Sequence, residues 1–121
     1  VDPGNCRRGP YSHETGSLAA LELLEKPDPP TAIFCGNDVI AFGALDAIEK
    51  LQIPMPDEIS IVGFDDIPAA AWLSPPLTTV RQPIREMAAA AVRTAAAIVD
   101  GTPVSAGDTE FPTRLVRRGS A

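Results

Sequence analysis

Two short apolar runs, each ending in polar side chains, constrain the fold of this chain more than any other feature. One run is Ser60–Phe64, which Asp65 and Asp66 follow directly, and the other is Thr31–Cys35, which a Gly-Asn-Asp sequence follows. Both runs are too short for a helix, and both are closed by glycine and acidic residues, so they predict buried strands of a parallel sheet. Ligands of open α/β sheets bind beyond the carboxyl ends of such strands. The sequence therefore predicts a polar, ligand-facing edge.

Amphipathic segments with helical spacing precede and separate the two runs. Ser12 is a candidate N-cap of a helix that continues to Glu25, with leucines at positions 18, 21 and 24. Asn37 or Asp38 is expected to cap a second helix, whose apolar face holds Ala41, Ala44, Leu45, Ile48 and Leu51. The order helix, strand, helix, strand predicts an α/β fold with a parallel sheet flanked by helices. The stretch Val1–Tyr11 is either a loop or the remnant of a strand.

The second half of the chain predicts a more extended arrangement. A short helical turn is expected over Ile67–Leu73, followed by an extended crossing segment over Leu77–Val80. A long helix is expected from Ile84 to about Asp100, with Gly101 as its C-terminal cap. Pro112–Arg117 is expected to form a terminal strand. The residues of the long helix expected to point inward are Ile84, Met87, Ala88, Ala91, Val92, Ala95 and Ile98.

Length and charge narrow the functional classes. The 121 residues suffice for one modest domain, and the net charge of −6 argues against nucleic-acid binding by this piece, because phosphate contacts need clustered Lys and Arg. No apolar run has the roughly 20 residues of a membrane span. The start lacks Met and a secretory signal, which favours a piece of a longer chain. Cys6 and Cys35 lack metal-site spacing, so a reduced, cytoplasmic thiol at Cys35 is favoured over a disulfide.

The polar residues after the two strands are the candidate binding residues. Asp65 is expected to face a small polar ligand, and the alternative is that Asp65 satisfies nearby backbone while Asp66 caps the following helix. Asn37 is an N-cap by default, but its donors and acceptor also suit vicinal hydroxyls of a sugar. Tyr11 either packs on the first helix or forms an aromatic plate under a ligand ring. His13 is expected at the surface, and nothing in the sequence has the spacing of a catalytic or metal-binding set.

Four stretches resemble the lactose-repressor/galactose-repressor family of bacterial transcription regulators. They are Pro30–Leu45, Ile53–Ile67, Ser74–Pro83 and Pro112–Arg118, in order and at the family's spacings. The resemblance implies a type I periplasmic-binding-protein-like fold, of which this chain is the C-terminal portion. It further implies that residues 1–80 belong to the C-terminal effector-binding subdomain, that 81–111 cross into the N-terminal subdomain, and that 112–121 form the returning strand.

The resemblance also implies roles for individual residues. Asn37 and Asp65 match the family's hydroxyl-binding residues, Tyr11 falls where members place an aromatic side chain against the effector, and Ile84 falls near the cleft wall. The implied partners are a small, sugar-like effector, a second copy of the chain, and DNA through a helix-turn-helix that this sequence lacks. No cofactor, metal, membrane or catalytic activity is implied. The alternatives are a transport-type sugar-binding protein, and an α/β enzyme whose nucleophile or metal set the sequence does not provide.

A dimer interface is expected on the second helix and after the paired acids. Phe42 is predicted to lie off the core face of its helix, beside Asp46 and Glu49. Trp72 and Leu73 are consecutive in a short helix and cannot both point inward, so an exposed apolar strip is expected there. The residues assigned to this interface are Phe42, Leu45, Asp46, Glu49, Trp72 and Leu73. The alternative for Phe42 is packing on an upstream part of the same subdomain.

Overall fold

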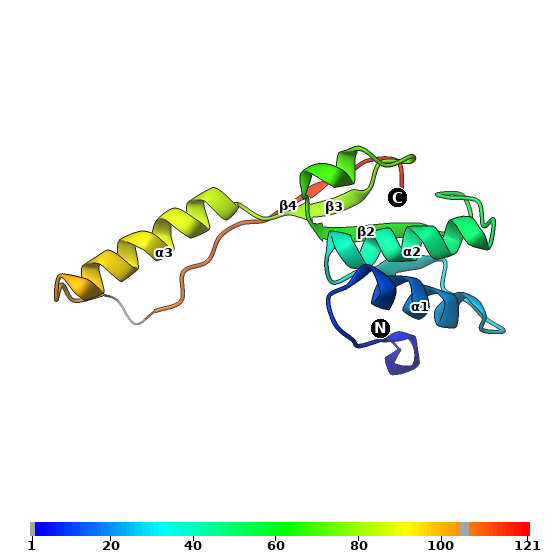
Figure 1. Cartoon of the computed structure of the whole chain (residues 1–121), viewed down its shortest axis with the longest axis horizontal. Coiled ribbons are helices and arrows are strands. Elements are labelled where there is room, and N and C mark those ends of the chain that lie inside the picture. Colours follow the sequence, from blue (N-terminus) through cyan, green and yellow to red (C-terminus); the bar gives the residue numbers. More distant parts are fainter. Residues whose placement is uncertain (1, 105–106) are drawn as a thin grey trace. The chain divides into compact units, whose positions relative to one another are not determined.

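The computed structural model of the chain describes residues 2–104 and 107–121 and separates into two compact units (Figure 1). Unit 1 comprises Val1–Arg81 together with Leu115–Ala121, and unit 2 comprises Gln82–Arg114. The chain thus leaves unit 1 after Arg81 and re-enters it at Leu115. The expected subdomain limits lie near these two points, and the assignment of the units to subdomains stays a prediction.

The sheet has four strands in the order β1-β2-β3-β4. β1 (Ala32–Phe34) pairs in parallel with β2 (Ser60–Asp65), and β2 pairs in parallel with β3 (Thr78–Arg81). β4 (Arg114–Val116) is the neighbour of β3. The two apolar runs are therefore adjacent parallel strands, as predicted, and the expected crossing segment after Leu77 is β3. The expected α/β class with a sheet flanked by helices is confirmed.

One helix precedes β1 and a second connects β1 to β2, and both begin at the predicted caps. The hydroxyl of Ser12 accepts a hydrogen bond from Thr15 N at 3.1 Å, and α1 (His13–Leu24) follows. α2 (Asp38–Lys50) follows Asn37 in the same way. Short 3-10 turns lie at Pro3–Asn5 (η1) and Pro68–Ala71 (η2). Over residues 2–11 the structure has η1 and irregular backbone, so the loop interpretation holds there and the strand remnant does not.

The core of unit 1 lies where α2 meets the sheet and α1. Its largest fully buried apolar side chains are Ile48, Ile59, Ile61 and Leu77. α1 and α2 pack closely because a glycine on each faces the other helix: a Cβ on Gly16 would collide with the carbonyl of Ile40, and one on Gly43 with the carbonyl of His13. Two predicted apolar-face positions are exposed instead, Leu18 at 56% and Leu51 at 39%. Leu18 is displaced because small residues, Gly16 and Ala20, occupy the close crossing.

Unit 2 contains the long helix α3 (Ile84–Val99), which ends before Gly101 at a φ of +69°. The predicted extent and glycine cap are confirmed, since a left-handed residue after the last turn favours glycine. None of the helix residues expected to point inward is buried, and Val92 is 68% exposed. The described part of unit 2 offers no second helix for them to pack against. Within the described residues, no helix combines the length and the hydropathy that crossing a membrane requires.

Candidate functional site at the carboxyl edge of the sheet

The candidate site lies where β1 and β2 end. The two strands pair with Phe34 opposite Val62, and the Cys35 amide donates to the Val62 carbonyl at 2.8 Å, so both strands reach the same edge. Asn37 follows β1 at this edge, and Asp65 is the last residue of β2. The expected polar edge is therefore present. Whether these two side chains hold a ligand stays a prediction.

Asn37 serves as the N-cap of α2. Its side-chain oxygen accepts a hydrogen bond from Ile40 N at 2.9 Å, and its backbone is extended. This bond involves only the side-chain oxygen. The side-chain NH₂ group, which can donate two hydrogen bonds, does not take part in it. Capping and ligand contact are thus compatible in one residue. The half-buried side chain is held in place by a bond that does not consume its donors.

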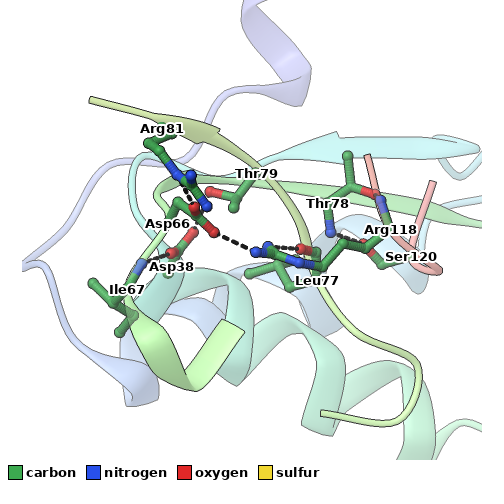
Figure 2. Close-up of polar contacts among 9 residues, drawn as sticks. All are labelled: Asp38, Asp66, Ile67, Leu77, Thr78, Thr79, Arg81, Arg118 and Ser120. Carbon is green, nitrogen blue, oxygen red and sulfur yellow. Dashed lines mark hydrogen bonds and ion pairs between the residues drawn. The ribbon is translucent and has the colours of Figure 1, made fainter. Parts of the chain in front are cut away.

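Asp38 is the buried centre of the edge and was not among the predicted site residues. Its Oδ2 accepts a hydrogen bond from Ile67 N at 2.9 Å, and its Oδ1 accepts one from the Thr79 hydroxyl at 2.5 Å (Figure 2). Asp38 and Thr79 are both fully buried. One carboxylate thus ties the start of α2 to β3 and to the turn after β2. The sequence signal for it is Gly63, because a glycine inside a buried strand marks a close approach.

The paired acids lie on a turn in which both residues have positive φ, 115° at Asp65 and 57° at Asp66. Figure 2 shows the Asp66 carboxylate between two arginines: Oδ1 accepts from Arg118 Nη2 at 2.6 Å, and Oδ2 accepts from Arg81 Nε. The Asp66 side chain is 2% exposed. The alternative in which Asp66 caps the following helix is wrong, since η2 has no side-chain cap and Asp38 binds the Ile67 amide instead.

The environments of the two buried acids shift their pKa values in opposite directions. Burial raises the pKa of Asp38; the bonds from Thr79 and Ile67 lower it in part, and the charges of Asp65 and Asp66 raise it further. Burial also raises the pKa of Asp66, but the hydrogen bonds and charges of its two arginines outweigh burial and hold it below the ordinary value. Asp66 is therefore a stably ionised group at neutral pH.

Two further predicted ligand residues occupy different units. The Tyr11 ring lies against Gly36, whose added Cβ would stand 3.4 Å from the ring, so Tyr11 sits next to the Asn37 loop. The side chain is 71% exposed, which does not fit packing on the first helix. Ile84 is the first residue of α3 in unit 2 and is 55% exposed. In unit 1, Tyr11 adjoins the Gly36–Asn37 segment that follows β1, and Asp65 ends the neighbouring strand β2.

An apolar hollow of about 810 Å³ lies beside β1 and α1. Tyr11 and Gly36 line it, together with core side chains such as Leu23, Ile33 and Phe34, but Asn37 and Asp65 do not. Polar side chains also line it, namely Asp2, Asn5, Arg7 and Arg8 of the N-terminal segment and Thr15 of α1. The hollow includes neither Asn37 nor Asp65 and is therefore distinct from the polar edge.

The residues assigned to a dimer interface differ in exposure. Trp72 is 78% exposed, whereas Phe42, Leu45 and Leu73 are partly buried and pack against the core. The prediction that Trp72 and Leu73 diverge is thus confirmed. The prediction that Phe42 lies off the core face is wrong, because Phe42 packs against the buried core. Glu49 is exposed. Whether these residues form an interface stays a prediction.

His13 is exposed, as predicted, but it has a carboxylate partner that its sequence neighbours do not reveal. Its Nε2 lies 2.9 Å from Oδ2 of Asp46, which α2 supplies across the helix crossing. Both side chains are about half exposed. Among residues 2–104 and 107–121, no three His, Cys, Asp or Glu side chains gather as metal ligands would.

The sequence model of the family "periplasmic binding protein-like domain" matches residues 4–121 of this chain. The chain belongs to that family. Within it, the relatives are regulators of the lactose-repressor type, which confirms the resemblance found in the sequence.

Three relatives illustrate the match. The HTH-type transcriptional repressor CytR of Escherichia coli K12 is 39% identical over 120 residues, which are 99% of this chain and 35% of CytR. A regulatory protein of the LacI family from Chloroflexus aggregans has a TM-score of 0.89 at 34% identity, over 99% of this chain and 43% of that one. A LacI family regulator from Lactobacillus casei with bound sucrose has a TM-score of 0.78 at 29% identity, and the match covers 91% of this chain and 41% of that one.

The chain spans about a third of the length of the curated relatives it matches. These relatives are transcriptional regulators, so the comparison favours a part of a regulator over the transport-protein alternative.

Proposed function

We propose that this chain is part of the effector-binding core of a cytoplasmic, non-enzymatic transcription regulator, and that Asn37 and Asp65 bind a small polyhydroxylated effector. The observation that carries the proposal is the shared edge: Asn37 keeps its amide donors, Asp65 adds a carboxylate, and the buried Asp38 fixes the surroundings of both. An amide and a carboxylate together satisfy adjacent hydroxyls, which are both donors and acceptors.

Tyr11 extends the proposed site within unit 1, and Ile84 is proposed on the family resemblance alone. The exposed Tyr11 ring beside Gly36 supplies an aromatic face for the apolar side of a sugar ring. Ile84 is an apolar contact in unit 2, assigned through the family resemblance. A related regulator holds sucrose in one crystal structure and glucose in another, which supports the choice of a sugar-like effector. No cofactor or metal is part of the proposal.

DNA binding is proposed to reside outside this chain. The chain is acidic, with a net charge of −6, and clustered positive charge is what attracts the phosphate backbone. The matched relatives are named as HTH-type regulators and are about three times longer. A helix-turn-helix elsewhere in the full-length protein would therefore contact the operator.

The test is effector binding by the full-length protein. A thermal-shift screen with glucose, sucrose and other small polyols selects a binder, and calorimetry then measures its affinity. Asp65→Asn keeps the side-chain shape and tolerates positive φ, so it removes the charge without new strain. We expect the affinity to fall about fivefold, because a neutral hydrogen bond is worth roughly 1 kcal/mol less than a charged one.

A matched control removes one negative charge from the protein at a position away from the edge. Asp57 is exposed and precedes β2, so Asp57→Asn should leave the affinity unchanged. Equal affinities for the unmutated protein and Asp65→Asn would contradict the assignment of Asp65.

We also propose a homodimer in which Trp72 and its surroundings contact a second copy. Trp72 is 78% exposed beside its chain neighbour Leu73, and Phe42 of α2 is partly buried. We assign these apolar side chains to the interface and Asp46 and Glu49 to its charged rim. Light scattering of Trp72→Glu should give a monomer, because the substitution charges the exposed surface without disturbing the core.

Phe42→Glu is a poorer probe of this interface, since Phe42 packs against the core and a charge there would also destabilise the fold. The control is Leu18→Glu, which charges an exposed apolar residue of α1 and should stay dimeric. A Trp72→Glu variant that remains as dimeric as the control would refute the interface.

A further inference from the structure

The turn that carries Asp65 is under backbone strain. Asp65 and Asp66 are consecutive residues other than glycine, and both have φ in the left-handed region. Such conformations persist only where the surrounding structure holds them. The contacts that hold this turn therefore decide how Asp65 is presented.

Besides the pairing of Asp65 with Arg81 in the sheet, the carboxylates of Asp38 and Asp66 make contacts that hold the turn. After the turn, the Ile67 amide is bound by Asp38 at 2.9 Å. Within it, the Asp66 carboxylate is bound by Arg81 and by Arg118 (Figure 2). With a side chain 2% exposed, Asp66 depends on these two arginines for its ionised state.

The two arginines come from the two places where the chain crosses between its units. Arg81 is the last residue of unit 1 before the chain passes into unit 2, and Arg118 lies shortly after the chain returns at Leu115. Arg118 also donates to the Leu77 carbonyl at 2.7 Å, which fixes its guanidinium beside the start of β3. A single carboxylate thus joins both crossings.

The returning segment is bound to the sheet at its far end as well. The Ser120 hydroxyl donates to the Ile61 carbonyl at 2.7 Å and accepts from the Thr78 amide at 2.8 Å, and the Ile61 amide donates to the Ser120 carbonyl. Ser120 is fully buried between these strands. The segment is therefore anchored at Ser120, and Asp66 is the contact that links it to the Asp65 turn.

We propose that Asp66 is a positioning residue which couples the conformation of the Asp65 turn to both chain crossings. Loss of the Asp66 charge breaks its ion pairs with Arg81 and Arg118 together and lets the strained turn relax. By reciprocity, a hydroxylated ligand that holds Asp65 also steadies the two crossings. The part of this coupling that involves ligand rests on the proposed function, whereas the link between turn and crossings does not.

The first test needs no ligand. Amide hydrogen exchange of the full-length protein is measured at residues 65–67, 80–82 and 115–119. Asp66→Asn should accelerate exchange about tenfold or more in all three segments. Arg81→Gln replaces a side chain that is 43% exposed and is the milder variant should Asp66→Asn not fold; it should also accelerate exchange around Arg118, through the shared carboxylate.

The control is Arg7→Gln, which removes another arginine–carboxylate pair, with Glu22, on the surface of α1. It should leave all three segments unchanged. The proposal is overturned if Arg81→Gln loosens its own segment alone, or if Asp66→Asn leaves the 65–67 turn unchanged.

The second test uses glucose and sucrose as probes, by calorimetry and exchange. A sugar that binds should slow exchange at the two crossings of the unmutated protein, and this slowing should be absent in Asp66→Asn. Equal slowing in both proteins overturns the coupling. If Asp65→Asn binds the sugar as well as the unmutated protein does, the proposed site is wrong, and the exchange results without sugar still decide the role of Asp66.

Discussion

The carboxylate of Asp38 occupies the space that a side chain on Gly63 would need. A Cβ at position 63 would collide with Asp38 Oδ1 and stand 2.9 Å from Leu77 Cδ2. Because the Asp38 carboxylate binds both Thr79 and the Ile67 amide, it cannot move away from such a Cβ without breaking these hydrogen bonds. The glycine in β2 therefore permits the buried acid that organises the candidate site.

Gly63→Ala should destabilise the protein by about 2 kcal/mol, since overpacking a filled core costs roughly 1–3 kcal/mol. Urea unfolding at neutral pH measures this loss. Gly4→Ala is the control, because a Cβ there meets only the Asp2 side chain at ordinary contact distance. A Gly63→Ala protein as stable as the control would mean that Asp38 does not hold this position in solution.

Gly43→Ala should also be destabilising, by about 2 kcal/mol. Alanine is the better helix former by roughly 1 kcal/mol, so an exposed glycine would show a gain. At position 43 the new Cβ would collide with the His13 carbonyl and force α1 and α2 apart. Thermal unfolding beside Lys50→Ala, an exposed change on the same helix, separates the two effects; a raised melting temperature for Gly43→Ala would contradict the close crossing.

The contribution of Asp66 to stability should depend on pH. Its pKa in the folded protein lies below the ordinary value of 3.8, so the stabilisation is present above that value and is lost as pH falls through the lowered pKa. At pH 7, Asp66→Asn should cost about 3 kcal/mol, the usual loss when a buried ion pair is broken.

The measurement is urea unfolding of both proteins between pH 7 and pH 2.5. The difference in unfolding free energy should shrink below pH 3.8. Asp38 has the opposite, raised pKa and destabilises the fold as pH rises, but it is present in both proteins and largely cancels. A difference that stays constant down to pH 2.5 would argue against an ionised Asp66.

The two cysteines should differ in reactivity. Burial and the nearby Asp38 charge raise the pKa of the Cys35 thiol to about 12, whereas Cys6 is exposed. Because the thiolate is the nucleophile, iodoacetamide at pH 8 should modify Cys6 in the folded protein and reach Cys35 only in guanidinium. Mass spectrometry should detect one adduct on the folded protein and two on the protein in guanidinium. The folded Cys6→Ser variant should carry none. Native modification of Cys35 at the rate of Cys6 would contradict its burial.

The sequence by itself determined the order of elements, the parallel pairing of the first strands and the caps at Ser12 and Asn37. These features depend on local physics: an apolar run bounded by glycine and acids forms a strand, and a side-chain oxygen before a helical segment satisfies its free amides. The same logic placed Asn37 and Asp65 at one edge, because carboxyl ends of parallel neighbours coincide.

Only the tertiary structure decided what Asp66 binds, where Phe42 lies and which acid is buried. Arg118 is 52 residues from Asp66, and Thr79 is 41 residues from Asp38, so no local pattern connects them. The inward face of α3 also failed as a prediction, since a helical pattern of apolar residues states which side would be buried but not whether anything covers it. Packing partners come from the fold, whereas the sequence pattern supplies only the surface they would cover.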